Sequence, residues 1–227
     1  MRWALLLLLV ACTNEVDPAW QLSHDRVIAV SMTPPHIAAG ETSQVNGLLG
    51  RVGDAPFEVD PDTVTVESPT SLMSTLSQTA DGHWQVTTAS EDQLAAARTE
   101  LMIAATNPVP VSLRMVFAYK SLVAHKLVYM GDHADNPSLG AVMIDGVDAT
   151  TESSITVAPI TDIPLQVNFP DTDDINWLTS CGSMHDFDLA KAYLRVETAD
   201  PQTGTLGVVV RDTQGGVAWQ LWPISAQ

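Results

Sequence analysis

The stretch RVIAVSMTPPHIAAGETSQVNGLLGRV, residues 26–52, decides the fold of this chain. Its first part, residues 26–32, combines apolar alternation with β-branched side chains, which is typical of a strand. Pro34-Pro35 ends this strand, because proline has no N–H to donate to a sheet. Ala39-Gly40-Glu41 has turn composition, and residues 44–52 have the pattern of a returning strand. The stretch therefore predicts a pair of strands at the start of a β-domain.

Strand signals continue along the chain, and turn pairs such as Asp81-Gly82 and Asp145-Gly146 separate them. We expect further strands at residues 63–67, 83–88, 101–105, 111–119, 126–129, 141–144, 154–157, 163–169, 192–197, 206–211 and 217–224. Turn signals spaced by roughly 8–12 residues, with few helices between them, are the pattern of β-sandwiches. The sequence therefore predicts an all-β chain.

One segment departs from this pattern. Ser90 is followed three residues later by Gln93, which is the spacing of a capping box, and an alanine-rich run follows. We expect one short helix over residues 91–99.

Residues 26–50, with their strand, proline pair, Ala-Gly-Glu turn and returning strand, resemble the opening of Ig-like domains in bacterial surface proteins. The resemblance implies an Ig-like β-sandwich at residues 26–130, and we expect a second β-sandwich domain at residues 131–227. The Cys…Trp…Cys core of antibody domains is absent, so only the sandwich architecture carries over.

The N-terminus has the organisation of a secretory signal, with Arg2, an apolar run over residues 3–10 and the small residue Ala11. The apolar run is shorter than the roughly 20 residues of a membrane span. Leu9-Val10-Ala11-Cys12 resembles the lipobox of bacterial lipoproteins. A plain secretory signal with an incidental cysteine, or a buried N-terminal helix, are the alternatives.

The lipobox resemblance implies cleavage after residue 11, with diacylglycerol and an N-acyl chain on Cys12 and a lipidated tether over residues 12–25. These covalent lipids are the only cofactor that we expect. Thr13 rather than Asp follows the cysteine, which by resemblance to the common sorting rule implies the outer membrane. The whole chain looks similar to acidic lipoproteins of the bacterial envelope.

The charge of the chain restricts its partners. Lys and Arg number 10 and Asp and Glu number 27, which gives a net charge of −17. Such a surface repels phosphate backbones, so we expect no nucleic-acid partner. It also disfavours adsorption to anionic lipids, so acyl chains would have to hold the protein at the bilayer.

The densest group of reactive residue types comprises Cys181, His185, Asp186 and Asp188. Thiolate and imidazole together favour zinc or copper, with a carboxylate as third ligand. A nucleophilic Cys–His pair is the other chemical interpretation. We favour a connecting loop in which Cys181 fills an apolar gap, because a structural zinc site usually has four Cys or His ligands. With Cys12 lipidated, Cys181 has no partner for an intramolecular disulfide.

Acidic loops offer a calcium alternative. Asp171 and Asp173 resemble the start of an oxygen-ligand loop, but Asn176 and Gly182 stand where an EF-hand needs Gly and Glu. Residues 60–62 and 132–135 form similar acidic loops, although acidic residues in turns more often cap the backbone.

Standard catalytic signatures, such as G-x-S-x-G, S-x-x-K, H-E-x-x-H and C-x-x-C, are absent from the sequence. Trp219 and Trp222 lie three residues apart, so in a strand they face opposite sides, and only one can enter the same core. We therefore expect a non-enzymatic binding or structural module, whose partner is an envelope protein or a glycan. A metal-dependent or thiol enzyme at Cys181 and His185, or a calcium-stabilised adhesion module, remains the alternative.

Overall fold

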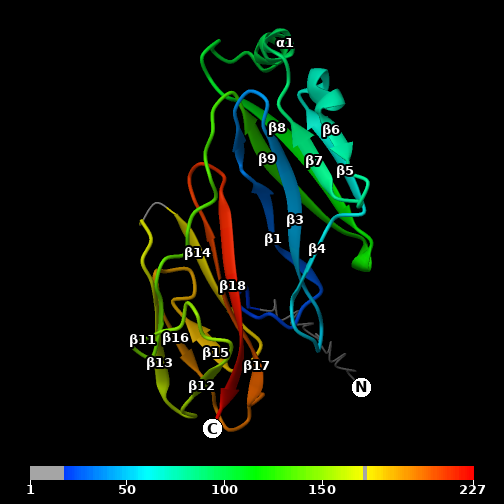
Figure 1. Cartoon of the computed structure of the whole chain (residues 1–227). Coiled ribbons are helices and arrows are strands. Elements are labelled where there is room, and N and C mark those ends of the chain that lie inside the picture. Colours follow the sequence, from blue (N-terminus) through cyan, green and yellow to red (C-terminus); the bar gives the residue numbers. More distant parts are fainter. Residues whose placement is uncertain (1–17, 171–172) are drawn as a thin grey trace, which may run out of the picture.

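The computed structural model describes residues 18–170 and 173–227, and these form two β-sandwiches joined by one extended segment (Figure 1). The strands of the first sandwich lie within residues 26–130, and those of the second lie within residues 142–226. The lipobox at residues 9–12 lies outside the described residues. No helix in the described part of the chain is long and apolar enough to cross a membrane.

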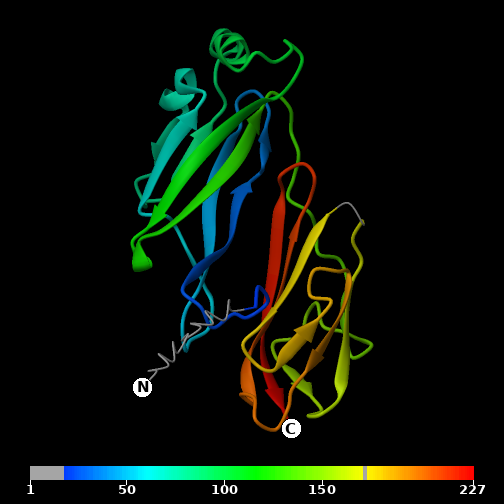
Figure 2. The ribbon, with the colours of Figure 1, turned by 180° about the vertical axis from the view of Figure 1, so that it is seen from behind.

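The first sandwich consists of two sheets that face each other across its core (Figure 2). One sheet has the order β1 (Arg26–Thr33), β3 (Thr42–Gly50), β7 (Trp84–Thr87), β6 (Leu76–Gln78), with β4 (Phe57–Val59) paired to β3. The other has the order β2 (His36–Ile37), β9 (Leu122–Met130), β8 (Val109–Phe117), β5 (Thr63–Ser68). All pairs are antiparallel except β2 with β9.

The second sandwich has the same plan. One sheet runs β11 (Val147–Asp148), β10 (Val142–Ile144), β13 (Asp162–Val167), β16 (Lys191–Arg195), β15 (Ser183–His185). The other runs β12 (Ile155–Val157), β18 (Val217–Ala226), β17 (Thr203–Arg211), β14 (Asp174–Thr179). Here too one short strand, β12, pairs parallel with the last strand, β18.

The strand order identifies the architecture. If the main strands of each sandwich are lettered along the chain from A to G, with β2 and β12 as A′, both have an A-B-E-D sheet opposite an A′-G-F-C sheet. The Ig constant-type sandwich has the same division, ABED against CFG. The prediction of an all-β chain with two consecutive Ig-like β-sandwich domains is therefore confirmed.

Alternation along the strands explains why these residues form sheets. Strand β8 is buried at every second position, and Val111, Leu113 and Met115 point into the first core. Truncating such a buried side chain to alanine costs about 2–5 kcal/mol. Cores of this kind, rather than a disulfide, therefore stabilise the sandwich.

The predicted helix is present as α1 (Glu91–Leu101), at the far end of the first sandwich (Figure 1). Ser90 caps it in a complete capping box with Gln93. The expected strand at residues 101–105 is wrong, because the helix continues through Leu101 and ends at Met102 in the left-handed conformation. A turn follows before β8 begins.

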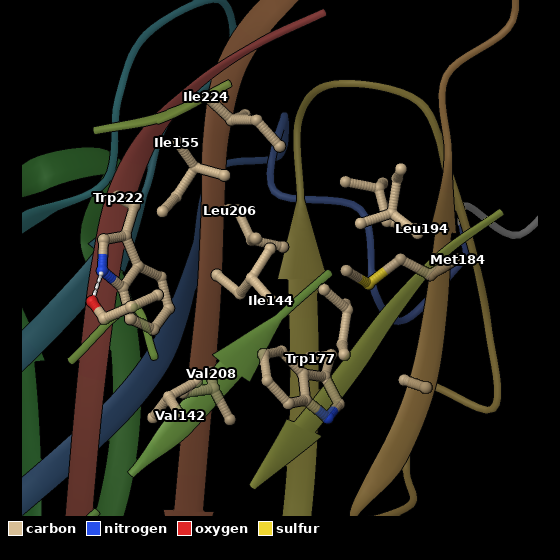
Figure 3. Close-up of a cluster of buried hydrophobic side chains, with 14 of the residues drawn as sticks. Val142, Ile144, Ile155, Trp177, Met184, Leu194, Leu206, Val208, Trp222 and Ile224 are labelled. Atoms are coloured by element: carbon tan, nitrogen blue, oxygen red, sulfur yellow. Dashed lines mark hydrogen bonds between the residues drawn. The ribbon is translucent and has the colours of Figure 1, made fainter. Parts of the chain in front are cut away.

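The core of the second sandwich is organised by two tryptophans (Figure 3). Trp177 on β14 is fully buried, and Trp222 on β18 is 1% exposed and donates from Nε1 to the carbonyl oxygen of Ala149 at 2.9 Å. Strand β14 holds the C position, where antibody domains also bury a tryptophan. Cys181 packs in the same cluster as a free thiol.

The two sandwiches meet through a third apolar cluster, which we call the junction. It contains side chains from both sandwiches and from the segment that precedes them: Leu22, Ile28, Ala29, Leu48, Leu178, Val209 and Val217. Leu22 is fully buried there. The expectation of a tether up to residue 25 therefore needs correction, because Gln21 pairs with Thr179 of the second sandwich and Asp25 accepts a hydrogen bond from Tyr119 of the first.

Candidate functional site

The reactive residues singled out by sequence do not form one site. Cys181 is buried, and its Sγ donates to the carbonyl oxygen of Pro201 at 3.0 Å. His185, Asp186 and Asp188 are exposed at the end of β15 and in the following turn. Burial raises the pKa of the Cys181 thiol, which disfavours the reactive thiolate. The segment is thus strand and turn rather than one connecting loop, with Cys181 filling the core as expected.

The acidic loops use their carboxylates within the fold. Asp60 pairs with His83, with 2.6 Å between Oδ2 and Nδ1, and Asp62 accepts a hydrogen bond from the backbone N–H of Ala118. Asp171 lies outside the described residues, and Asp173 is a half-buried neighbour of β14. Across residues 18–170 and 173–227, no group of three or more His, Cys, Asp or Glu side chains has metal-binding geometry.

Polar contacts fix the junction around the loop between β17 and β18. Two carbonyl oxygens of this loop accept hydrogen bonds from side chains of the first sandwich. The Gln214 carbonyl accepts from His36 Nε2 at 2.8 Å, and the Gly215 carbonyl accepts from Lys126 Nζ at 2.5 Å. Asn136, in the segment between the sandwiches, donates to the carbonyl of Met32 and accepts from the N–H of Val217, each at 2.8 Å. These bonds join the two domains in one defined arrangement.

A groove of about 870 Å³ lies on the second sandwich at the end of β17 and β18 that is opposite this loop, and we call it the hydroxyl groove. Three parts of the chain line it: Trp20, Gln21 and Ser23 before the first strand, residues 53–55 between β3 and β4, and loops and strand ends of the second sandwich. Its hydroxyl-bearing side chains are Ser23, Ser154, Thr179, Ser180, Ser183, Thr203, Thr205 and Ser225. Sites at domain boundaries with convergent polar groups are common ligand sites.

Backbone hydrogen bonds position the tryptophan of this groove. The N–H of Thr179 donates to the carbonyl of Trp20 at 2.9 Å, and the N–H of Leu22 donates to the carbonyl of Thr179 at 2.8 Å. The segment thereby adds to the edge of the sheet beside β14. Trp20 is half-buried, with part of its ring packed against the second core.

Close packing shapes the wall of the groove. Ser180 Oγ accepts from the N–H of Thr205 at 2.8 Å. A side chain at Gly204 would place its Cβ 2.5 Å from that same Oγ, so only glycine permits this approach. The hydroxyl-rich wall is therefore held by strand and loop contacts that do not need a ligand.

The charge of the groove is weakly acidic. Among its lining residues the charged ones are Asp54 and Asp200, and none is Lys, Arg or His. Asp54 accepts from Arg51 at 2.8 Å, and Asp200 accepts from the N–H of Glu197 at 2.8 Å. Hydrogen bonds, first to the N–H of Ala55 and then to Arg51, lower the pKa of Asp54. Both carboxylates are thus occupied by neighbours that order the loops.

Sequence reasoning missed this groove, because its walls come from segments far apart in the chain. Trp20 falls in the segment that the sequence predicts to be a tether, although an aromatic residue in a polar segment is a usable signal. The expectation for the last strand is confirmed: Trp222 is in the core, and Trp219 faces the other way. Trp219 donates from Nε1 to Glu58 Oε1 at 2.8 Å, so its neighbour is the first sandwich.

No family model matches the sequence, and no curated protein matches it either. The chain is similar in structure to murine CEACAM1b, with 8% identity over 88% of this chain and 100% of that one, and a TM-score of 0.29. It is also similar to the N-terminal Ig1-2 module of the Drosophila receptor protein tyrosine phosphatase DLAR. The identity is 9% over 90% of this chain and 100% of that one, with a TM-score of 0.30.

A third similar structure is an endo-fucoidan hydrolase from glycoside hydrolase family 107. The identity is 13%, over 86% of this chain and 28% of that one, with a TM-score of 0.24. These similarities are low, and the architecture is defined by the strand order of the two sandwiches. The chain is a tandem of two Ig-like β-sandwiches.

Proposed function

We propose that this protein is a lipid-anchored, non-enzymatic binding module of the bacterial envelope, held in the outer membrane through Cys12. The support for the anchor is the sequence Leu9-Val10-Ala11-Cys12 after a short apolar run. The net charge of −17 gives the surface no attraction to anionic lipids, so acylation would be the means of attachment.

The hydroxyl groove is the proposed binding surface, and a neutral saccharide is its proposed ligand. The observation that carries this proposal is the lining: serine and threonine hydroxyls in addition to the buried Thr179 and Thr205, a half-buried tryptophan and no basic side chain. Hydroxyls both donate and accept, which suits a ligand that is itself rich in hydroxyls. The ring of Trp20 offers an apolar surface to the C–H face of a sugar.

The lack of cationic groups argues against anionic ligands in this groove. A phosphorylated or carboxylated ligand would be desolvated beside Asp54 and Asp200 without a compensating charge. Binding without chemistry is supported by the environment of the side chains. Within the described part of the groove, no nucleophile is hydrogen-bonded to a general base.

Titration of neutral oligosaccharides into the purified protein tests the proposed ligand. Trp20→Ala is expected to weaken binding at least tenfold, and Ser183→Ala less, because burying an aromatic ring contributes more than one hydrogen bond. Tyr193→Ala is the matched control, since this aromatic is 43% exposed on β16 and does not line the groove. Equal binding by all three variants would contradict the proposal.

A separate experiment tests the anchor. Cys12→Ala is expected to abolish incorporation of labelled fatty acid and to release the protein from the membrane fraction. Cys181→Ala is the control, because that thiol is buried in the second core. If the Cys12 variant remains in the membrane fraction, acylation is not the means of attachment.

A further inference from the structure

A second cavity lies at the junction and differs from the hydroxyl groove in charge. It has a volume of about 160 Å³ and is lined by Arg26 of the first sandwich and Arg211 of the second. The remaining lining is apolar apart from Asn176, and it contains no carboxylate. The chain has only 10 Lys and Arg residues against 27 acidic ones. Two of these few cations therefore line one small cavity without a lining counter-charge.

Arg26 is the less satisfied of the two. Its Nε is buried without a hydrogen-bond partner, and its side chain makes no ion pair with the described residues. Burial lowers the pKa of its guanidinium, and no neighbouring carboxylate counters this. A partly buried charge without a partner is unfavourable, so a negative group beside Arg26 would be stabilised.

Arg211 is held by neutral acceptors. Its Nη1 donates to Asn176 Oδ1 at 3.0 Å, and its Nη2 donates to the carbonyl oxygen of Ile28 at 2.8 Å. Burial lowers the pKa of this guanidinium as well, and Asp174 opposes the shift through its charge. The second bond crosses from one sandwich to the other. Arg211 is thus fixed in place while its positive charge stays without a direct ion pair among the described residues.

We propose that this cavity binds one small oxyanion, a sulfate or phosphate ion, which contacts Arg26 of the first sandwich and lies beside Arg211 of the second. Guanidinium groups recognise such anions through paired N–H donors. The volume of 160 Å³ is several times the roughly 30 Å³ that a water molecule takes in the liquid, which suits one such group. The site is independent of the hydroxyl groove and of what that groove binds.

The anion that we propose is a dissolved one, such as sulfate or phosphate, because the described lining of the cavity supplies no carboxylate of its own.

The test is thermal unfolding of the full chain, purified in detergent, with millimolar sodium sulfate against sodium chloride of equal ionic strength. For a dissolved anion, sulfate should raise the Tm of the wild type saturably, by about 2–4 °C. Arg26→Gln should lose this rise, and Arg26→Lys should keep part of it. Arg114→Gln is the control, because Arg114 lies on β8 away from the cavity.

Two outcomes would overturn the proposal. Equal rises in the wild type and Arg26→Gln would show general salt stabilisation. Calorimetric titration of sulfate into the wild type avoids the arginine variants, and an absence of saturable heat would show that the cavity binds no anion.

Discussion

The Nε2 of His36 lies 2.8 Å from the carbonyl oxygen of Gln214, a residue 178 positions later in the chain, and this contact joins the two sandwiches. A carbonyl oxygen only accepts, so Nε2 is the donor. The other ring nitrogen lies 2.8 Å from Asp132 Oδ1, and the ring stacks on Tyr129 at 4.5 Å. One buried histidine therefore connects the first sandwich, the segment between the domains and the last hairpin.

This relationship predicts that His36→Ala destabilises the protein by about 1–3 kcal/mol, because the variant leaves the Gln214 carbonyl at the junction without its donor. Urea unfolding of both proteins measures the difference. His83→Ala is the matched control, since that ring also pairs with an aspartate but is 45% exposed. Exposed pairs contribute about 0–1 kcal/mol, so a loss at His83 as large as that at His36 would contradict the prediction.

Lys126 predicts a pH dependence at the same junction. Burial, with a smaller contribution from the charge of Arg211, lowers its pKa from 10.5 to about 8. Between these values the unfolded chain binds more protons than the folded one, so the Lys126 contribution to stability rises with pH from about 8 to 10.5. The rise is on the order of 1–3 kcal/mol.

Lys126→Met tests this dependence. Unfolding in guanidinium chloride at a series of pH values measures the free energy of unfolding of both proteins. The difference between them removes the contributions of all other groups, and it should show that the variant lacks the rise in stability above pH 8. Lys120→Met is the control, because Lys120 is 60% exposed and pairs with Asp25 at 3.6 Å. Parallel pH profiles for the wild type and Lys126→Met would exclude a lowered pKa at this position.

The two tryptophans of β18 differ in burial, so we expect their replacement by alanine to lower the stability of the protein by different amounts. Trp222→Ala should destabilise the protein by about 3–5 kcal/mol, because it removes a fully packed ring and the hydrogen bond to Ala149. Trp219→Ala should lower the stability less, and part of its effect should come from the lost hydrogen bond to Glu58. A double-mutant cycle of Trp219→Ala with Glu58→Gln checks this, and additive losses would show that the pair does not interact.

The sequence predicted the sandwich architecture well, because most strands have one face in a core and one in solvent. Strand β8 shows this alternation along its whole length, and its position was predicted to within two residues. The turn at Asp145-Gly146 and the cap at Ser90 were also recognisable, because local hydrogen bonding determines both.

Strand β14 was missed for a physical reason. Trp177, Leu178 and Thr179 are buried in succession, because Trp177 faces the second core while Leu178 faces the junction. A strand with both faces covered loses the period of two that identifies it. The hydroxyl groove and the cavity lined by Arg26 and Arg211 could not be predicted from the sequence for a related reason. Each depends on how the two sandwiches meet, and no local sequence pattern encodes this.

The segment before β1 gives the final prediction. Leu22 is fully buried at the junction, although Gln21 and Ser23 flank it, and its N–H donates to the carbonyl oxygen of Thr179 at 2.8 Å. Leu22→Ala should therefore destabilise the protein by about 2–5 kcal/mol, as expected for a buried leucine rather than for a residue in a free tether. Leu189→Ala is the matched control, since Leu189 is 54% exposed. Chemical unfolding gives the two losses, and amide exchange at Thr179, which donates to Trp20, should accelerate only in the Leu22 variant. If Leu22→Ala is as stable as the control, the segment contributes nothing to the fold, and Trp20 has no fixed place in the hydroxyl groove.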